Sequence, residues 1–344
     1  MDEKKQNNPR NNALDGIRAL SAVGIIFMHV LSNGGYEISG FIGEKLIPSF
    51  TDLVFLFMIV SGYAMCCGYY EKIFNKTIAI EDFYGRRIAK IWPFFAFLSL
   101  VDLALSPSSN SLYETFANLT LCFGFLPNAD ISVIGVGWFI GLVFVFYFTF
   151  PFFCYLLANK KRAWLAFAAA LIFNYLCQVR FDAPRSNIVF SAVFFLAGGL
   201  LYLYREPLKK LAQKCKWLVF LAVIVGGAAY YWLDGAVPVM LVLFSLMVIY
   251  TMDTEGKYRI LSNPVTRFLG NISLEMYLCH MVVFRVMEKV GLTNVFPSAV
   301  LSFAATAVGT LVGAIILSTA FQFAIKGIEK WIKRLIEKKE KTEI

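Results

Sequence analysis

This 344-residue chain holds two histidines, His29 and His280, and each lies in a strongly apolar stretch. His29 closes the segment LDGIRALSAVGIIFMH, which carries Asp15 and Arg18 near its start. Ionisable side chains in such stretches are costly to bury and mark functional sites. A histidine can take a proton from a hydroxyl group at neutral pH, and an arginine can bind phosphate through two parallel hydrogen bonds. The segment therefore indicates proton-transfer chemistry at one end and anion binding at the other.

Helical geometry puts Arg18 and His29 on the same face. Eleven residues at about 100° each end about 20° past three full turns, with an axial separation of about 16 Å. Asp15 precedes Arg18 by three residues and can neutralise it. The shared face indicates a reagent that stretches from one side chain to the other. The alternative is that Arg18 anchors the topology while His29 packs in the interior.

Two further residues are candidates at a depth similar to that of His29. Asp52 lies early in the second apolar segment, where it could accept a hydrogen bond from His29 and fix its tautomer. A place near the outer interface is the alternative for Asp52. His280 shares a helical face with Ser273 in the ninth apolar segment, and we expect it to position a substrate or to stabilise an oxyanion, with packing as the alternative. The remaining ionisable residues inside apolar segments are Asp102, Glu275 and Arg285.

Cations gather ahead of the third apolar segment. In the stretch YGRRIAKIWPFF, Arg86, Arg87 and Lys90 precede Pro93. Such a cluster suits a polyphosphate, because arginine makes bidentate phosphate contacts. The alternative is that these charges only mark the cytoplasmic side of the membrane.

The elements that must position these residues are membrane-spanning helices. Hydrophobic residues make up 58% of the chain and charged residues only 16%, with a mean hydropathy of +0.65, which is too little charge for a soluble domain. Apolar runs of about 17–25 residues recur, the length that crosses a bilayer as a helix. The stretch 116–126 is too short to span and is expected at the interface or dipping into the membrane. We predict an all-α polytopic membrane protein with ten transmembrane helices, at residues 13–33, 46–68, 88–106, 133–157, 163–180, 187–204, 217–233, 236–252, 268–288 and 297–324.

Lysine and arginine are concentrated in the loops that follow the even-numbered spans and in the N-terminal segment. The positive-inside rule then places both termini in the cytoplasm. The net charge of +9 needs no nucleic-acid partner, because topology and attraction to anionic membrane lipids account for it.

The chain divides into three parts. Residues 1–12 form a polar cytoplasmic N-terminus that leads directly into the first span, so no cleavable signal peptide is expected. Residues 13–324 form one membrane domain, and residues 325–344 form a basic tail with the pattern of an interfacial amphipathic helix. The seven cysteines show no CxxC spacing, so we expect packing residues rather than disulfides or metal ligands.

Several segments together resemble the acyltransferase family 3 membrane proteins, which are bacterial O-acyltransferases of surface polysaccharides and related acceptors. The opening segment is similar to the family's LDGxRA start, with ten residues between Arg18 and His29. Two features depart from the family pattern: Lys90 stands where arginine is usual, and Val143 and Phe144 stand where many members carry glutamates. The other matching segments, in family order, are FMIVSGY (57–63), RRIAKIWP (86–93), GWFIGLVFVFYFTFP (137–151) and ISLEMYLCH (272–280).

The resemblance implies an acyl-CoA donor, most often acetyl-CoA, and a carbohydrate or glycolipid acceptor on the far side of the bacterial cell membrane. His29 is then the general base, with a transient acyl-histidine as the alternative, and Asp52 and His280 assist it. The donor's phosphates are expected at Arg18, Arg86, Arg87 and Lys90. The acceptor cavity is expected to be lined by Trp138, Tyr147, Ser273 and Tyr277, each of which could instead be a packing residue.

Two rival functions remain at this stage. Buried Asp, Arg and His residues also mark the ion pathways of transporters and channels, and a non-catalytic membrane partner in polysaccharide assembly would share the composition. An ion path does not require a cation cluster paired with a histidine on the same helix face. No metal is expected, and homo-oligomerisation is left open.

Overall fold

A computed structural model describes residues 12–126, 131–252 and 260–340 of the chain. Over these residues the fold is entirely helical, without a strand. The predicted N-terminal segment and the loop cations Lys257 and Arg259 lie outside the described residues. The α-helices are α1 (Asn12–Asn33), α2 (Ile47–Ser49), α3 (Leu53–Met65), α4 (Glu71–Phe74), α5 (Ile80–Leu105), α6 (Ser109–Thr120), α7 (Trp138–Leu157), α8 (Lys160–Val179), α9 (Ile188–Leu203), α10 (Arg205–Lys214), α11 (Lys216–Trp232), α12 (Val237–Tyr250), α13 (Pro264–Asn271), α14 (Ser273–Lys289) and α15 (Ala299–Glu340).

Many of these helices are long and apolar enough to cross a membrane. Within the described residues six runs meet that test, and α9 with α10, bent by 76° between them, would form a seventh. The helices α11 and α12 are apolar but shorter. The chain is therefore a multi-pass membrane protein, and each of the ten predicted spans contains a helix. The six runs are Ala13–Asn33, Ile42–Phe74, Ile80–Leu105, Trp138–Leu157, Lys160–Val179 and Ala299–Ile328.

The second run is interrupted before α3. A π-helix η1 (Ile42–Leu46) leads into α2, and a 3-10 turn η2 (Phe50–Asp52) leads into α3. Pro48 lies between them and has no backbone N–H to donate, so the regular hydrogen-bond ladder cannot continue through it. A second π-helix η3 (Cys66–Tyr70) joins α3 to α4. These changes in winding set the position of Asp52 just ahead of α3.

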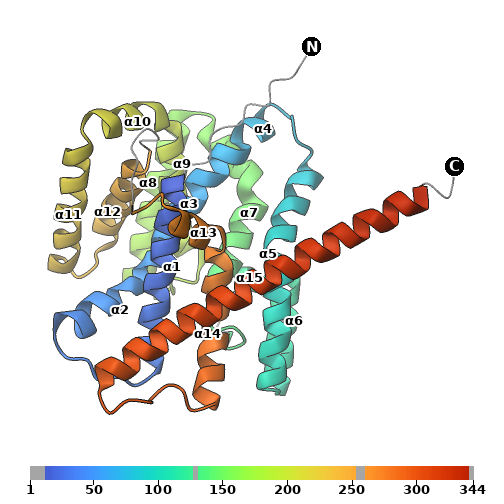
Figure 1. The fold of residues 1–344 in the computed structure, drawn as a ribbon. Helices are drawn as coiled ribbons and strands as arrows, with labels where there is room; N and C mark the ends of the chain where they lie inside the picture. The colour runs from blue at the N-terminus through green and yellow to red at the C-terminus, as the bar shows by residue number, and fades with distance from the viewer. Residues whose placement is uncertain (1–11, 127–130, 253–259, 341–344) are drawn as a thin grey trace.

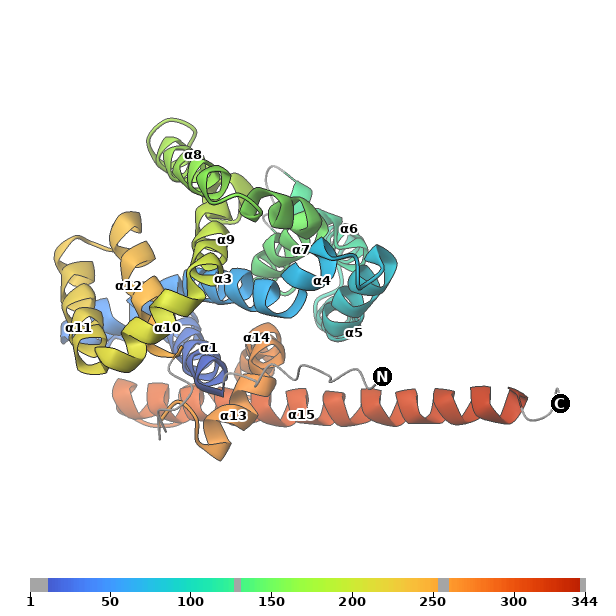
Figure 2. The ribbon, with the colours of Figure 1, turned by 90° about the horizontal axis from the view of Figure 1, so that it is seen from above.

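The interior of the bundle is built around α1 and α3 (Figures 1 and 2). Helix α3 packs along α9, and α1 contacts α3, α14 and α15. Helix α15 runs obliquely along one side of the bundle, outside α14 and α1, as Figure 2 shows from above. Helices α11 and α12 pair at one end of the molecule, and α5, α6 and α7 lie towards the other. Helix α1 is therefore enclosed by neighbours, as a helix carrying a functional face must be.

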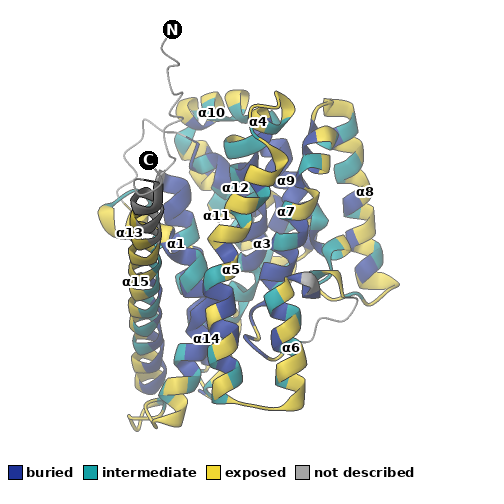
Figure 3. Cartoon of the chain, turned by 90° about the vertical axis from the view of Figure 1, so that its right-hand side faces the viewer, coloured by how far each residue is buried: buried dark blue, intermediate teal, exposed yellow. Residues whose placement is uncertain are grey.

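Peripheral helices expose their apolar side chains. Leu165 on α8, Trp217 on α11 and Phe323 on α15 are all largely exposed, and Figure 3 shows exposed residues along the outer sides of α8 and α15. In a membrane these side chains contact lipid, where their exposure costs nothing. The stretch 116–126 is divided at Leu121, whose positive φ of 58° ends α6 before a short 3-10 turn η4 (Cys122–Phe125). The tail helix continues α15 to Glu340, but the side chains of Ile332, Leu335 and Ile336, which carry the predicted amphipathic face, are not described.

Candidate active site

The two histidines of the chain lie against each other. His29 on α1 and His280 on α14 have ring centroids 5.1 Å apart, with an angle of 42° between the ring planes. Sequence reasoning placed both at similar depths but did not predict that they meet. His29 is partly accessible, whereas His280 is fully buried. We call this pair the histidine site.

Helix α14 fixes the tautomer of His280. Its Nδ1 lies 2.6 Å from the carbonyl oxygen of Tyr277, and because a carbonyl can only accept, Nδ1 carries the hydrogen. In the neutral ring Nε2 is then a bare acceptor. That Nε2 is buried and has no hydrogen-bond partner among the described residues. Tyr277 is itself buried and donates from its hydroxyl to the carbonyl oxygen of Val136 at 2.9 Å.

Asp52 does not make the predicted bond to His29. Its Oδ2 accepts a hydrogen bond of 2.6 Å from the hydroxyl of Tyr230 on α11. Asp52 lies in the turn η2, near the end of α11, where its carboxylate contacts Tyr230. The sequence interpretation of Asp52 as the group that orients His29 is therefore wrong for this conformation, although Asp52 remains part of the surroundings of the site.

Arg185 is the residue that sequence reasoning missed at the histidine site. It lies in the loop between α8 and α9, donates from Nη1 to Thr51 Oγ1 at 2.7 Å and stacks over the ring of Trp138 at 5.2 Å. Its charge acts electrostatically on His29, Asp52 and Tyr277. The available signal was that Arg185 is the single cation of the predicted outer loop 181–186.

The other end of α1 carries a second cluster. Arg87 on α5 donates from Nη2 to the hydroxyl of Tyr69 at 2.6 Å, and its guanidinium stacks 4.6 Å from the Tyr69 ring centroid. Arg87 also interacts with the hydroxyl of Tyr147, on which Arg18 acts electrostatically. Arg18 in turn pairs with Asp15 at 3.3 Å, as predicted. We call Arg18, Arg87, Tyr69 and Tyr147 the arginine cluster.

The predicted donor residues thus separate into two groups. Arg18 and Arg87 both act on Tyr147, and Arg87 keeps a buried Nε without a hydrogen-bond partner among the described residues. Arg86 and Lys90 are exposed on α5. Arg86, one residue before Arg87, points about 100° around the helix axis from it, whereas Lys90, three residues after Arg87, lies only about 60° from it.

The predicted acceptor residues also separate. Trp138 lies at the histidine site beside Arg185, and Tyr277 packs against His280 with ring centroids 5.9 Å apart. Tyr147 belongs to the arginine cluster instead, about 13 Å along α7 from Trp138 at 1.5 Å per residue. Ser273 is buried and donates to the carbonyl oxygen of Gly270 at 3.0 Å, where it stabilises the turn between α13 and α14. The predictions for Tyr147 and Ser273 as acceptor residues are therefore not supported by their positions.

The family comparison decides the class of this arrangement. A family model described as "Acyltransferase domain", that of acyltransferase family 3, matches residues 11–319, nearly the whole chain. The chain belongs to acyltransferase family 3. No curated protein and no solved structure gave a significant match. The predicted family is thereby confirmed, and membership indicates acyl transfer as the type of reaction.

Close backbone contacts explain two glycines in the segments that resemble this acyltransferase family. A Cβ on Gly16, in the LDG segment, would lie 2.0 Å from the carbonyl oxygen of Leu261. A Cβ on Gly62, in the SGY segment, would lie 2.4 Å from the carbonyl oxygen of Phe195. Only glycine allows these approaches. The first sets the position of α1 and hence of Arg18 and His29, and the second sets α3 against α9.

Two carboxylates hold the segment that precedes Trp138. Asp102 on α5 accepts from Arg285 on α14 at 2.6 Å and from the backbone N–H of Ile134 at 2.7 Å. Glu114 on α6 accepts from the backbone N–H groups of Ser132 and Val133, both at 2.9 Å. Asp102 and Arg285, predicted as candidates for being ionisable within spans, are therefore structural. They fix the entry to α7 and with it the position of Trp138.

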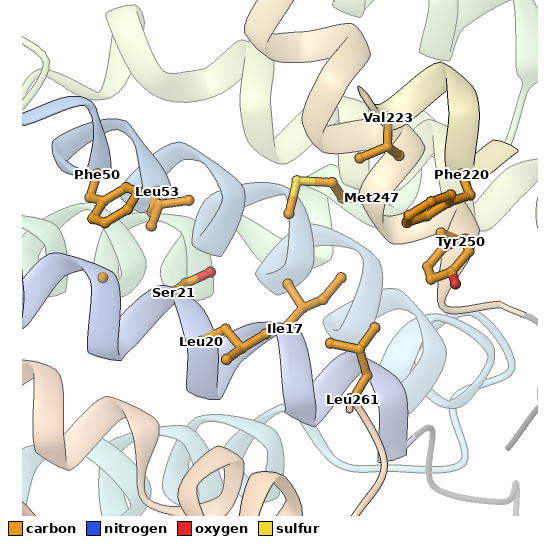
Figure 4. A pocket seen from close by; sticks show the side chains of 11 residues that line it. Ile17, Leu20, Ser21, Phe50, Leu53, Phe220, Val223, Met247, Tyr250 and Leu261 are labelled. Atoms are coloured by element: carbon orange, nitrogen blue, oxygen red, sulfur yellow. The ribbon is translucent and has the colours of Figure 1, made fainter. Parts of the chain in front are cut away.

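An apolar pocket of about 350 Å³ lies on an adjacent face of α1 (Figure 4). Its side chains come from α1, from the segment before α3 and from α11 and α12, and the picture shows Ile17 and Leu20 facing Met247 and Val223 across it. On the face between Arg18 and His29, by contrast, Ala22 and Ile25 are fully buried. The face of α1 that links the arginine cluster to the histidine site is therefore filled by packed side chains in this structure.

Proposed function

We propose that this chain is a membrane-bound O-acyltransferase that moves an acyl group, most simply acetyl, from cytoplasmic acyl-CoA to a hydroxyl group of a carbohydrate or glycolipid acceptor outside the bacterial cell membrane. The observation that carries the proposal is the pairing of two sites along one helix. The arginine cluster lies at the start of α1, and the histidine site lies about 16 Å further along its axis.

The arginine cluster supports binding of the donor. Coenzyme A carries several phosphate charges, and the guanidinium groups of Arg18 on α1 and Arg87 on α5, which both act on Tyr147, would supply charge-assisted donors for them. Arg87 still has its buried Nε to satisfy. Arg86 and Lys90, both exposed on α5, add positive charge to the same entrance.

The predicted topology assigns the two sites to opposite sides of the membrane. Ten crossings with both termini in the cytoplasm would put the arginine cluster at the cytoplasmic surface and His29 in the outer half of the membrane. This arrangement is supported by a helix in each predicted span and by the alternation of basic loops. The donor's carrier could then stay inside while its acyl group is used outside.

The chemistry at the histidine site would begin with proton transfer. His29 takes the proton of the acceptor hydroxyl while the hydroxyl oxygen attacks the thioester carbonyl carbon. The carbon–sulfur bond then breaks, and the departing thiolate of coenzyme A receives the proton. His280, with its fixed tautomer, would position His29 from the buried side. A transient acyl group on His29 remains the alternative route.

The donor's arm must pass the packed part of α1. Ala22 and Ile25 are buried on the face that joins the two sites, so the thioester can reach His29 only when neighbouring side chains move aside. Such gating would protect the thioester from water until the donor is in place.

Two variants of the purified protein test this function separately. In nanodiscs, coenzyme A should raise the melting temperature of the wild type and of His29→Ala, but much less that of Arg18→Ala, because losing a charged hydrogen bond weakens binding about tenfold or more. Acyl transfer from radiolabelled acetyl-CoA to a surface-carbohydrate fraction from cells lacking the gene should be abolished in His29→Ala. Wild-type transfer by His29→Ala, or no response of the wild type to coenzyme A, would contradict the proposal.

A further inference from the structure

Arg185 is held in place at the histidine site by two contacts. Its Nη1 donates to Thr51 Oγ1, and its guanidinium lies over Trp138 at the start of α7. Both contacts fix the plane of the guanidinium while using one of its five N–H donors. Arg185 is half-buried, and these two protein contacts hold its guanidinium in place.

The positive charge of Arg185 has no ion-pair partner within 4 Å among the described residues. The charge of Arg185 acts on Asp52, but the carboxylate of Asp52 accepts its hydrogen bond from Tyr230 and not from Arg185. A partly buried guanidinium with free donors is a site for an anion. Such an anion can form during the reaction or belong to a substrate.

The neighbouring base indicates which anion this is. Arg185 donates a hydrogen bond to Thr51 in the turn η2, and this turn packs against α1, which carries His29. When His29 takes a proton, the charge of Arg185, which acts on His29, repels the new cation. An anion that forms between them at the same moment removes that repulsion. In acyl transfer the thioester carbonyl oxygen becomes such an anion when the hydroxyl attacks.

We infer that Arg185 stabilises the oxyanion of the tetrahedral intermediate, an inference that rests on the proposed function. As the acceptor oxygen bonds to the carbonyl carbon, the π electron pair moves to the carbonyl oxygen and the hydroxyl proton moves to His29. Arg185 donates hydrogen bonds to that oxygen. The carbonyl double bond then re-forms, the carbon–sulfur bond breaks, and the thiolate of coenzyme A takes the proton from His29.

The test separates catalysis from binding in the same nanodisc assay. Rates with radiolabelled acetyl-CoA are measured over a range of acceptor-fraction concentrations for the wild type, Arg185→Gln and Arg185→Lys. Arg180→Gln is the matched control, because Arg180 is exposed at the end of α8, in the same loop. We expect Arg185→Gln to lower kcat by about 100- to 1000-fold, as removal of an oxyanion donor does. Acceptor KM and stabilisation by coenzyme A should stay near wild type, and Arg180→Gln should behave as wild type.

Three outcomes would overturn the inference. If Arg185→Gln raises acceptor KM at unchanged kcat, Arg185 binds an acidic group of the acceptor instead. Wild-type kinetics in Arg185→Gln would leave Arg185 without a role in the reaction. If the wild type itself transfers nothing, the proposed function fails and the inference falls with it. Should Arg185→Gln not fold, Arg185→Lys and Thr51→Val provide the same comparison, with a lowered kcat supporting the inference and a raised KM alone contradicting it.

Discussion

The ring of His280 is oriented by a hydrogen bond to its own helix. The roles of its two nitrogens, Nδ1 and Nε2, can therefore be tested by different substitutions. In His280→Asn the side-chain amide can still donate to the carbonyl oxygen of Tyr277, but the acceptor at the Nε2 position is lost. In His280→Gln an amide oxygen can reach the Nε2 position. We expect His280→Asn to fold and to lose at least about tenfold in acyl transfer, and His280→Gln to retain more activity.

Melting temperature and the nanodisc transfer assay give both readouts for the His280 variants. Equal, wild-type activity in the two would assign His280 to packing, which was the alternative at the sequence level. Equal loss in both would indicate that the ring itself, and not the acceptor at Nε2, is required.

Individual residues were predictable from the sequence where their relation is local. The shared face of Arg18 and His29 and the pairing of Asp15 with Arg18 depend only on helical periodicity. The approach of His29 to His280, the bond from Tyr230 to Asp52 and the place of Arg185 depend on how distant helices pack. Periodicity carries no information about that packing, so these contacts were missed or wrongly predicted.

At the scale of elements, the crossing of α3 and α9 depends on a glycine. A Cβ at Gly62 would lie 2.4 Å from the carbonyl oxygen of Phe195 and 3.3 Å from the Cα of Gly198, and a backbone atom cannot rotate away. We expect Gly62→Ala to push the helices apart and to cost about 1–3 kcal/mol, the usual range for overpacking. Its melting temperature in detergent should fall by several degrees.

Gly68→Ala is the matched control for Gly62→Ala, because nothing lies within 4 Å of a Cβ at Gly68. Alanine is the better helix former, so this variant should melt at or slightly above the wild-type temperature. An equal fall in both variants would mean that the close contact at Gly62 is not the cause of the loss.

The helices themselves were more predictable than their ends. Six of the described apolar runs are helices long enough to cross a bilayer, because a helix is the way a single segment satisfies its backbone in lipid. The short helices α10 and α13, the π-helices and the turn at Pro48 were not predicted. They depend on local breaks in the hydrogen-bond ladder that hydropathy does not register.

For the whole molecule the open question is how many times the chain crosses the membrane. Helix α11 has 17 residues and α12 has 14, about 25 Å and 21 Å at 1.5 Å per residue, which is less than a hydrocarbon core of about 30 Å. Trp217 and Trp232 stand at the two ends of α11 and are both strongly exposed. Tryptophan favours the two membrane interfaces, so this pair favours a full crossing by α11, which a locally thinned bilayer would allow.

Reporter fusions test this topology directly. Alkaline phosphatase is active only outside the cytoplasm and green fluorescent protein fluoresces only inside it, so each is fused in turn after Lys214, Asp234, Leu292 and Ile344. We expect phosphatase activity after Asp234 and Leu292 and fluorescence after Lys214 and Ile344, in keeping with the positive-inside rule. Fluorescence after Asp234 alone would mean that α11 and α12 do not cross, leaving eight spans and the site's orientation unchanged. Phosphatase activity after Ile344 together with fluorescence after Leu292 would place the outer end of α14 inside. The histidine site would then face the cytoplasm, and transfer to an acceptor outside the cell would be excluded.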